Sequence, residues 1–291
     1  ILKYLYLKQE GMRKNMKKNL NFYITLWIVK LISAGLKLLG KNATYYPGKL
    51  ALDMCPGFMG MLDKPKTIIG VTGTNGKTTV SNMINDILID NGYKIINNKY
   101  GSNIDAGIAT TLLQGATLFG KSKKEIAVLE IDERSAPKVF PYITPTYLIC
   151  TNIFRDSLMR NAHTEFISEI VSKNVPKDTI VIENADDLIC SGIAPNNAKI
   201  YFSIDKLDTD TKEPHNIVRD IITCPVCNTK LEYEYYRYHH IGKAHCPKCG
   251  FGTPKADYIA NNIDINNKKM CIKTPTGEQA VSYTHLTLPT T

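Results

Sequence analysis

Acidic residues are nearly absent from the start of this sequence. Residues 1–41 contain nine Lys and Arg side chains but one acid, Glu10, whereas the other 250 residues are close to neutral. The net charge of +9 therefore lies mainly on an N-terminal arm. Nucleic-acid-binding proteins more often carry basic residues on the folded body, so this distribution argues against that class and favours an anionic membrane surface.

An uninterrupted hydrophobic run is also lacking. Residues 20–39 are long enough to cross a bilayer, but Lys30 and Lys37 interrupt them and share one helical stripe with Thr25 and Ser33. We therefore predict an amphipathic helix. Peripheral docking on a membrane, packing on the protein core and a true membrane span remain alternative roles for it. No small-residue cleavage site is evident, so a signal peptide is not expected.

A disulfide framework is missing as well. Of the eight cysteines, four are scattered and four form two CxxC pairs separated by 18 residues: Cys224, Cys227, Cys246 and Cys249. Four thiolates at this spacing form two knuckles that close a structural, tetrahedral Zn²⁺ site. Asn228 and Gly250 follow the knuckles and tolerate the left-handed backbone of such turns. We predict a zinc ribbon at about residues 220–257, in a reducing cytoplasm.

Three histidines lie between the two cysteine pairs. They are expected to be ordinary surface or hairpin residues: His239, His240 and His245. A site closed by four cysteines needs none of them as a ligand.

Short apolar strands alternate with helical patterns through the middle of the chain. Strands are predicted at residues 67–71, 94–98, 126–131, 147–151, 179–183 and 199–203. A helix is predicted from Val80 to Leu88, where apolar residues recur at helical spacing, and it is expected to end near Gly92. The alternation predicts an α/β fold with a mostly parallel sheet flanked by helices.

A glycine-rich loop joins the first of these strands to the first helix. It comprises Gly73, Thr74, Asn75, Gly76, Lys77, Thr78 and Thr79. Glycines let the backbone wrap around phosphate oxygens, and the helix N-terminus favours their negative charge. Lys77 would neutralise the β- and γ-phosphates, and the Thr78 hydroxyl would bind Mg²⁺. Val71 stands where the standard phosphate loop has glycine, so the match is to a shorter variant.

This loop resembles that of the Mur ligase family, which includes the folylpolyglutamate synthetases. The resemblance implies that Glu130, at the end of the strand 126–131, binds Mg²⁺ with Thr78, whereas Asp132 and Glu133 are either further ligands or part of a solvated turn. It also implies adenine-side and substrate-side residues. The adenine-side residues are Asn184 and Asp187, and the substrate-side residues are Asn103, Asn152, Arg155 and Asp156.

The cysteine pairs, the Tyr-rich segment between them and His240-Ile-Gly resemble the insert found in the MurT branch of this family. The similarity covers roughly residues 20–275. It implies that ATP phosphorylates the α-carboxylate of D-isoglutamate in the lipid II stem peptide. Ammonia from a GatD-type glutaminase would then form D-isoglutamine. A basic amphipathic arm would suit an enzyme at the inner face of the plasma membrane, because this substrate is lipid-anchored.

The predicted organisation has four parts. A basic arm covers residues 1–19, of which 1–11 are upstream read-through if Met12 or Met16 is the true start. An amphipathic helical segment covers 20–60, an ATP-binding central domain with the ribbon insert covers 61–280, and a non-native tail covers 281–291. The family's C-terminal ligase domain has no room in this chain. We therefore expect an incomplete active site that lacks the aspartate contributed to the glutaminase triad.

Two other functions remain open at this stage. Another Mur-type ligase, which adds an amino acid instead of ammonia, would share the loop, but the ribbon argues against it. A zinc-ribbon nucleic-acid-binding protein would fit the isoelectric point of about 9.0 and the Tyr-rich hairpin. The near-neutral body and the phosphate loop argue against this second alternative.

Overall fold

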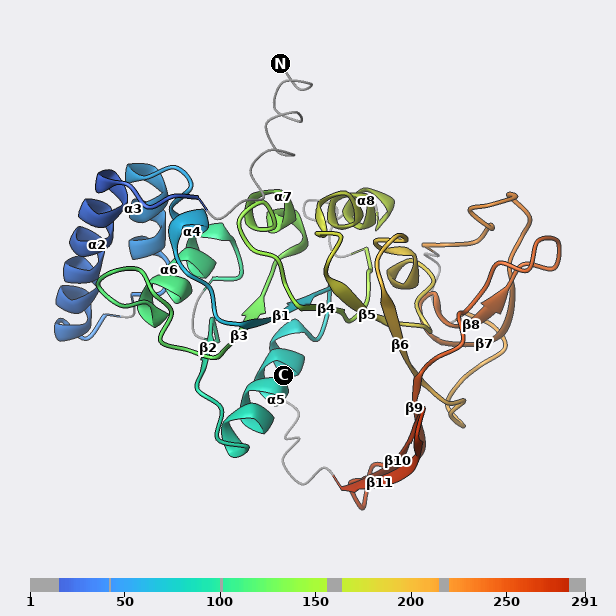
Figure 1. Cartoon of the computed structure of the whole chain (residues 1–291). Coiled ribbons are helices and arrows are strands. Elements are labelled where there is room, and N and C mark those ends of the chain that lie inside the picture. The colour runs from blue at the N-terminus through green and yellow to red at the C-terminus, as the bar shows by residue number, and fades with distance from the viewer. Residues whose placement is uncertain (1–15, 42, 100–101, 156–163, 215–219, 283–291) are drawn as a thin grey trace. The chain divides into compact units, whose positions relative to one another are not determined.

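The computed structural model of the chain forms two compact units (Figure 1). It describes residues 16–41, 43–99, 102–155, 164–214 and 220–282. Unit 1 comprises Ile1–Thr151, Glu165–Val181 and Ile193–Ala198, and unit 2 comprises Asn152–Thr164, Ile182–Gly192 and Lys199–Thr291. Helices and parallel strands alternate along the chain, which confirms the predicted α/β class.

Four parallel strands form the sheet of unit 1. Their order is β4 (Tyr147–Cys150), β1 (Thr67–Thr72), β3 (Ile126–Glu130) and β2 (Ile95–Asn97). Val71, Val128 and Leu148 have no exposed surface, as expected for a parallel sheet covered on both faces. Because parallel strands end at the same edge of a sheet, the loop after β1 and the carboxylate of Glu130 come together there.

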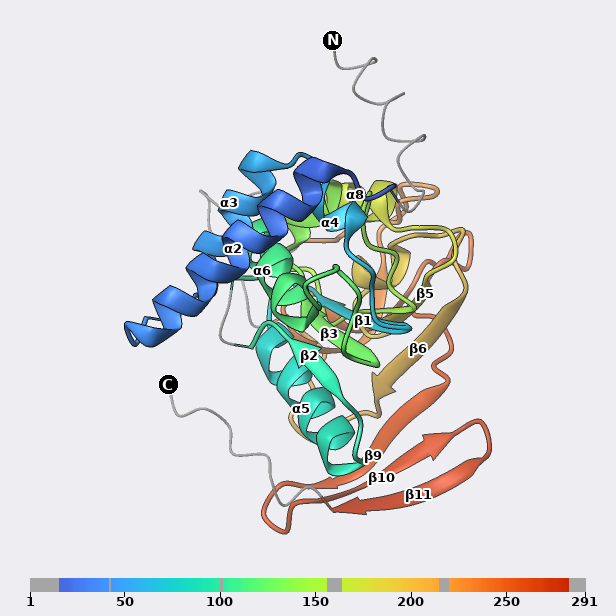
Figure 2. The ribbon, with the colours of Figure 1, turned by 60° about the vertical axis from the view of Figure 1, so that its left-hand side comes forward.

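Helices cover both faces of this sheet (Figures 1 and 2). One face carries α5 (Lys77–Asp90), and the other carries α6 (Asp105–Gly115), α7 (Ala136–Val139) and α8 (Thr164–Asn174). A short 3₁₀ turn, η1 (Glu133–Ser135), precedes α7. The predicted helix after the phosphate loop is therefore confirmed, although its apolar residue Ile87 is 58% exposed.

Within the described residues, three helices precede the sheet: α2 (Leu20–Leu38), α3 (Tyr46–Met54) and α4 (Phe58–Met61). α3 packs closely on α6, where the Gly48 amide donates to Thr110 Oγ1 at 2.8 Å. A Cβ atom on Gly48 would lie 1.9 Å from the Ala106 carbonyl oxygen. The missing side chain therefore allows α3 to pack directly on α6.

The orientation of α2 differs from the prediction. Thr25 and Ser33, expected on a solvated stripe, are buried. Lys30 Nζ donates to the carbonyls of Leu113 and Ala116, at 2.9 and 2.7 Å. These carbonyls lie at the C-terminal end of α6, where carbonyls lack the amides of a further helical turn, although the Leu113 carbonyl also accepts from the Ala116 amide. Their acceptor capacity draws the lysine inward. The outer side of α2 instead carries large apolar side chains: Leu20, Ile24, Trp27, Ile28, Leu31 and Leu38.

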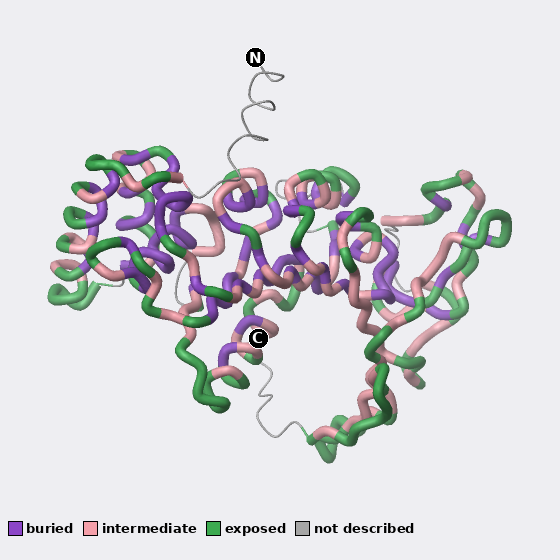
Figure 3. Tube along the Cα trace, in the orientation of Figure 1, coloured by how far each residue is buried: buried purple, intermediate pink, exposed green. Residues whose placement is uncertain are grey.

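Unit 2 has a parallel pair of strands that continues as an antiparallel arm. β6 (Lys199–Ile204) pairs in parallel with β9 (Tyr258–Asp264), and β10 (Lys269–Thr274) and β11 (Gly277–Ser282) follow in antiparallel order. None of the residues of β9, β10 and β11 is buried (Figure 3). β11 reaches Ser282 and so enters the predicted non-native tail. Residues 283–291 lie outside the described residues.

The cysteine ribbon lies between β6 and β9 in the sequence. Its hairpin consists of β7 (Glu232–Tyr238) and β8 (Ile241–His245), which pair in antiparallel order. Since β6 and β9 pair directly in the sheet, the ribbon is an insertion in the connection between two neighbouring parallel strands. A remaining strand, β5 (Ile180–Asn184), starts in unit 1 and ends in unit 2, where a short 3₁₀ turn, η2 (Cys190–Gly192), follows it.

Candidate functional site

The glycine-rich loop has the backbone that phosphate binding requires. Gly73 and Gly76 adopt positive φ angles of 122° and 82°, a region that favours glycine. Gly76 caps α5, which begins at Lys77. The amides at this helix start have no partners inside the helix and attract an anion together with the helix dipole. The predicted strand, loop and helix therefore follow one another as expected.

Lys77 pairs with a buried carboxylate. Its Nζ lies 3.1 Å from Glu133 Oε1, and the Gly73 amide donates to the same oxygen at 3.0 Å. Lys77 also donates to the carbonyls of Gly73 and Thr74. Glu133 is only 3% exposed, so the alternative of a solvated turn is wrong for this residue. Burial raises the pKa of Glu133, although Lys77 opposes the shift.

The two predicted magnesium ligands meet at the end of the sheet. The Thr78 hydroxyl donates to Glu130 Oε2 at 2.8 Å, and Asn103 Nδ2 donates to Oε1 of the same carboxylate at 3.2 Å. The backbone of Glu130 is fixed by Asn98, which exchanges two hydrogen bonds with it, each 2.8 Å long. A hydroxyl and a carboxylate side by side are the hard oxygen ligands that Mg²⁺ prefers. The residues present therefore fit this ion.

The predicted adenine-side residues lie in unit 2, with Asn184 at the end of β5 and Asp187 in the turn that follows it. Asn184 Oδ1 accepts from the Asp186 amide at 3.0 Å. Asp187 is fully buried, and its carboxylate accepts from the amides of Ile153, Ile189 and Cys190 at 2.7–3.0 Å. The Asp187 carboxylate therefore joins the loop after β4 to the turn after β5. Contacts of Asn184 and Asp187 with adenine remain a prediction.

The substrate-side residues are only partly described. Asn103 lies beside Glu130 in unit 1, as given above, whereas Asn152 begins the loop after β4 in unit 2. Arg155 Nε lies 3.2 Å from Asp220 Oδ1, and the arginine side chain is 42% exposed. Asp156 lies outside the described residues.

His240 lies in the hairpin turn between β7 and β8, as one of the two expected alternatives had it, but it is buried there. It is 1% exposed and not a surface residue, and its Nε2 lies 2.9 Å from Asp187 Oδ1. Its Nδ1 lies 3.4 Å from Asp220 Oδ2. Burial by itself would lower the pKa of His240, but the two aspartates outweigh burial and raise it to about 9. The imidazole in turn lowers the pKa of Asp220.

The four paired cysteines form one cluster. Sγ atoms of Cys224 and Cys249 are 3.5 Å apart, those of Cys227 and Cys246 are 3.4 Å apart, and all four lie within 4.8 Å of one another. Tetrahedral Zn²⁺ with Zn–S bonds of about 2.3 Å needs sulfur separations of about 3.8 Å. The residues after the knuckles have the predicted positive φ: 57° at Asn228 and 75° at Gly250. No disulfide occurs among the described cysteines.

Comparison with known proteins defines the family. Residues 71–246 match the profile of the Mur ligase middle domain. The chain belongs to the Mur ligase family. This match runs from β1 through the phosphate loop to Cys246, so it includes the phosphate loop, Glu130, Asp187 and three of the four paired cysteines, and Cys249 lies just beyond it.

The relatives of this Mur ligase chain include enzymes of cell-wall synthesis. The MurT subunit of lipid II isoglutaminyl synthase (glutamine-hydrolyzing) from Staphylococcus aureus (strain COL) is 30% identical over 246 residues, 84% of this chain and 55% of the relative. The subunit of the same name from Streptococcus pneumoniae (strain ATCC BAA-255 / R6) is 34% identical, covering 80% and 52%. The chain thus spans about half the length of the curated relatives it matches.

A solved structure of a related ligase has the same fold. The pseudomurein peptide ligase type C from Methanothermus fervidus superposes with a TM-score of 0.54 at 28% identity, covering 76% of this chain and 43% of the other.

Some residues of the candidate site had no clear signal in the sequence. Glu133 lies in the acidic segment after β3, but nothing local indicates that it reaches Lys77. Asp220 and His240 are 20 residues apart and meet only through the ribbon hairpin. A histidine between two cysteine pairs carries no pattern that separates a buried residue from an exposed one.

Proposed function

We propose that this chain is the ATP-binding part of a synthetase that amidates the D-isoglutamate of lipid II. A carboxylate oxygen attacks the γ-phosphorus of ATP, ADP leaves, and an acyl phosphate forms. Ammonia then attacks the acyl carbon, phosphate leaves, and the excess proton passes to solvent, which leaves the amide of D-isoglutamine. The observation that carries the proposal is the phosphate loop with Thr78 beside Glu130, in a chain similar to MurT subunits.

The loop and the two oxygen ligands give each residue a role. Lys77 would exchange its Glu133 partner for the β- and γ-phosphates, while Thr78 and Glu130 would hold Mg²⁺. Bound there, the ion would neutralise charge that develops on the phosphate oxygens. Positioning and charge stabilisation make up most of the catalysis of phosphoryl transfer.

The remaining contacts extend the same proposal. Asn184 and Asp187 would lie on the adenine side, whereas Asn103, Asn152, Arg155 and Asp156 would lie on the acceptor side. The cysteine cluster would hold one structural Zn²⁺, because four thiolates leave no position open for a substrate. Ammonia would come from a GatD-type glutaminase partner. We nominate no residue of this chain for the aspartate of the glutaminase triad.

We further propose that the outer side of α2 docks on an anionic membrane surface from the cytoplasm. Trp27 and Leu31 on α2 are 49% and 76% exposed. A second exposed apolar segment, Leu118–Phe119, lies beside α2, because Trp27 Nε1 donates to the Leu118 carbonyl. Exposed lysines flank these two segments in the sequence: Lys17, Lys37, Lys41, Lys121 and Lys123. Apolar side chains bordered by lysines suit an anionic lipid surface better than a neutral protein partner.

Vesicle sedimentation tests this surface. Leu31→Glu should weaken binding to phosphatidylglycerol vesicles about tenfold or more, because it places a carboxylate among lipid chains. Ile87→Glu changes a comparably exposed apolar residue of α5 and is the matched control. Equal binding to vesicles of phosphatidylcholine alone, or loss of self-association instead of vesicle binding, would contradict the proposal.

Nucleotide binding tests the ATP site in this chain directly. Lys77→Ala should weaken binding of Mg²⁺-ATP on the order of 100-fold, since it removes a charged hydrogen-bond donor to phosphate. Lys66→Ala, at an exposed lysine just before β1, is the control. Unchanged affinity in Lys77→Ala would refute the site.

The proposed reaction is tested with the full-length protein, because the chain spans about half the length of the MurT subunits it matches. Together with the glutaminase, glutamine carrying a labelled amide nitrogen, ATP and lipid II, the full-length protein should transfer the label to the stem peptide. Transfer of an amino acid instead would identify another Mur-type ligase. Salt-dependent binding of DNA or RNA without ATP turnover would identify a nucleic-acid-binding protein.

A further inference from the structure

The cysteine cluster shares its small core with the turn after β5. Leu188 from this turn packs with Cys224, Leu231, Ala244 and Cys246, and all five are buried. The core therefore contains two of the four metal-ligating cysteines and a residue that follows the predicted adenine-side segment directly. A change in the cluster would act on this turn through direct contact.

Asp187 extends the connection to the loop after β4. Its Oδ2 accepts from the Ile153 amide at 2.7 Å, while Oδ1 lies 2.9 Å from His240 Nε2 in the ribbon hairpin. The carboxylate is fully buried, so it depends on these partners instead of water.

His240 and Asp220 make a second connection to the same loop. The imidazole contacts the Phe154 ring in a tilted arrangement, with centroids 5.2 Å apart and planes at 53°, and its Nδ1 is 3.4 Å from Asp220 Oδ2. Asp220 in turn pairs with Arg155. Three consecutive residues of the loop, from Ile153 to Arg155, are therefore held by a buried imidazole or by its two aspartate partners.

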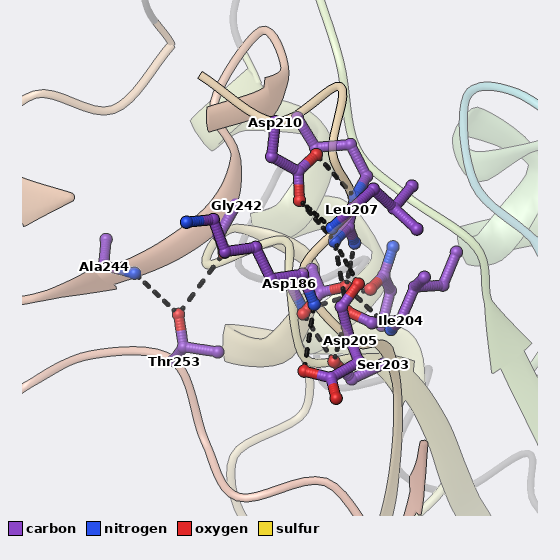
Figure 4. Close-up of polar contacts among 12 residues, drawn as sticks. Asp186, Ser203, Ile204, Asp205, Leu207, Asp210, Gly242, Ala244 and Thr253 are labelled. Atoms are coloured by element: carbon purple, nitrogen blue, oxygen red, sulfur yellow. Dashed lines mark hydrogen bonds and ion pairs between the residues drawn. The ribbon is translucent and has the colours of Figure 1, made fainter. Parts of the chain in front are cut away.

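The turn after β5 is also tied to the hairpin through Asp186 (Figure 4). Its Oδ2 lies 2.8 Å from Arg237 Nη1 in β7, and its backbone oxygen accepts from the Gly242 amide in β8 at 2.9 Å. Arg237 Nη2 also binds Asp210 at 2.9 Å. Both strands of the hairpin thus contact Asp186, the residue directly before Asp187.

We propose that the metal-bound ribbon positions the loop Asn152–Arg155 and the turn Asn184–Asp187, with His240 as the positioning residue that joins them. The importance of these two segments for catalysis rests on the proposed function. The structural coupling between the ribbon and the two segments does not depend on it. The ribbon would therefore contribute to ligand binding without touching a ligand. Metal binding would hold the hairpin in the shape that keeps His240 between Asp187 and Asp220.

Hydrogen exchange at single amides tests the coupling in this chain. The Ile153 amide should exchange at least about tenfold faster in His240→Gln than in the unchanged chain, because the buried charge that holds Asp187 is lost. His245→Gln is the matched control, since His245 lies in the same hairpin but is 53% exposed. Zinc content should stay at one ion per chain in both variants.

Metal removal provides the second arm. Stripping zinc should accelerate exchange of the Ile153 and Cys190 amides, both of which donate to Asp187, while the amides of β1 remain protected. Unchanged exchange at Ile153 after zinc removal, or equal acceleration in His240→Gln and His245→Gln, would overturn the proposal.

Kinetics of the full-length enzyme separate positioning from general destabilisation. His240→Gln should raise the KM for ATP or lipid II about tenfold and change kcat less, whereas His245→Gln should alter neither. A fall in kcat as large as the rise in KM, with zinc still bound, would contradict a positioning role. If the unchanged enzyme fails to amidate lipid II, the proposed function fails, and the exchange results still decide the coupling.

Discussion

The protonated His240 predicts a specific dependence of stability on pH. Its pKa of about 9 in the folded protein exceeds its ordinary value of 6.5. A raised folded pKa means that the stabilisation is fully present below about pH 6.5 and is lost as pH rises through about 9. The gap between the two values corresponds to about 3 kcal/mol, similar to the cost of breaking a buried ion pair.

His240→Gln should remove this contribution. We expect the variant to be about 3 kcal/mol less stable than the unchanged chain at about pH 6, and about equally stable above about pH 10. The carboxylates of Asp187 and Asp220 face the imidazole directly, and Arg155 lies behind Asp220, so no other described cation replaces the lost charge at Asp187. Other groups titrate in this range, but they do so in both proteins and cancel in the difference.

Urea-dependent hydrogen exchange in β7 and β8, with zinc present, measures this stability locally. Trp27, the single tryptophan, lies in unit 1 and reports unfolding of that unit as a control. A stability difference that does not change with pH would show that His240 is neutral in the folded protein. No difference at about pH 6 would refute the ion-pair argument altogether.

Two further predictions concern unit 1. Glu133→Gln should tighten Mg²⁺-ATP binding several-fold, because it removes the carboxylate that competes with phosphate for Lys77; weaker binding in a nucleotide titration would show that Glu133 mainly shapes the loop. Gly48→Ala should cost about 3 kcal/mol in urea unfolding followed by Trp27 fluorescence, because its Cβ meets the backbone of α6. Gly35→Ala, which has open space in α2, should instead stabilise by about 1 kcal/mol; equal effects of the two alanines would contradict the packing argument.

The phosphate loop and the cysteine cluster could be predicted because each depends on residues close in sequence. Glycines, Lys77 and Thr78 lie within one strand–loop–helix segment, and their chemistry requires that spacing. Each cysteine pair likewise forms its own knuckle. Parallel strand order then brought Glu130 to Thr78, as the family resemblance implied.

The face of α2 could not be assigned from helical periodicity. The pattern grouped Lys30 with Thr25 and Ser33, but a pattern does not say which side faces the core. The carbonyls at the end of α6 attract Lys30, and these acceptors come from a segment more than 80 residues away. The apolar side was left exposed as a result.

By itself, the sequence determined the α/β class, the phosphate-loop motif and the four-cysteine cluster, because local spacing specifies each of these, whereas the pairing of Thr78 with Glu130 was implied by the family resemblance. Only the tertiary structure decided the roles of Glu133, Asp187 and His240. A buried charge is stable only where a partner meets it, and these partners come from distant segments of the chain. The burial of His240 between two aspartates is therefore a property of the fold, with no signature in any single stretch of residues.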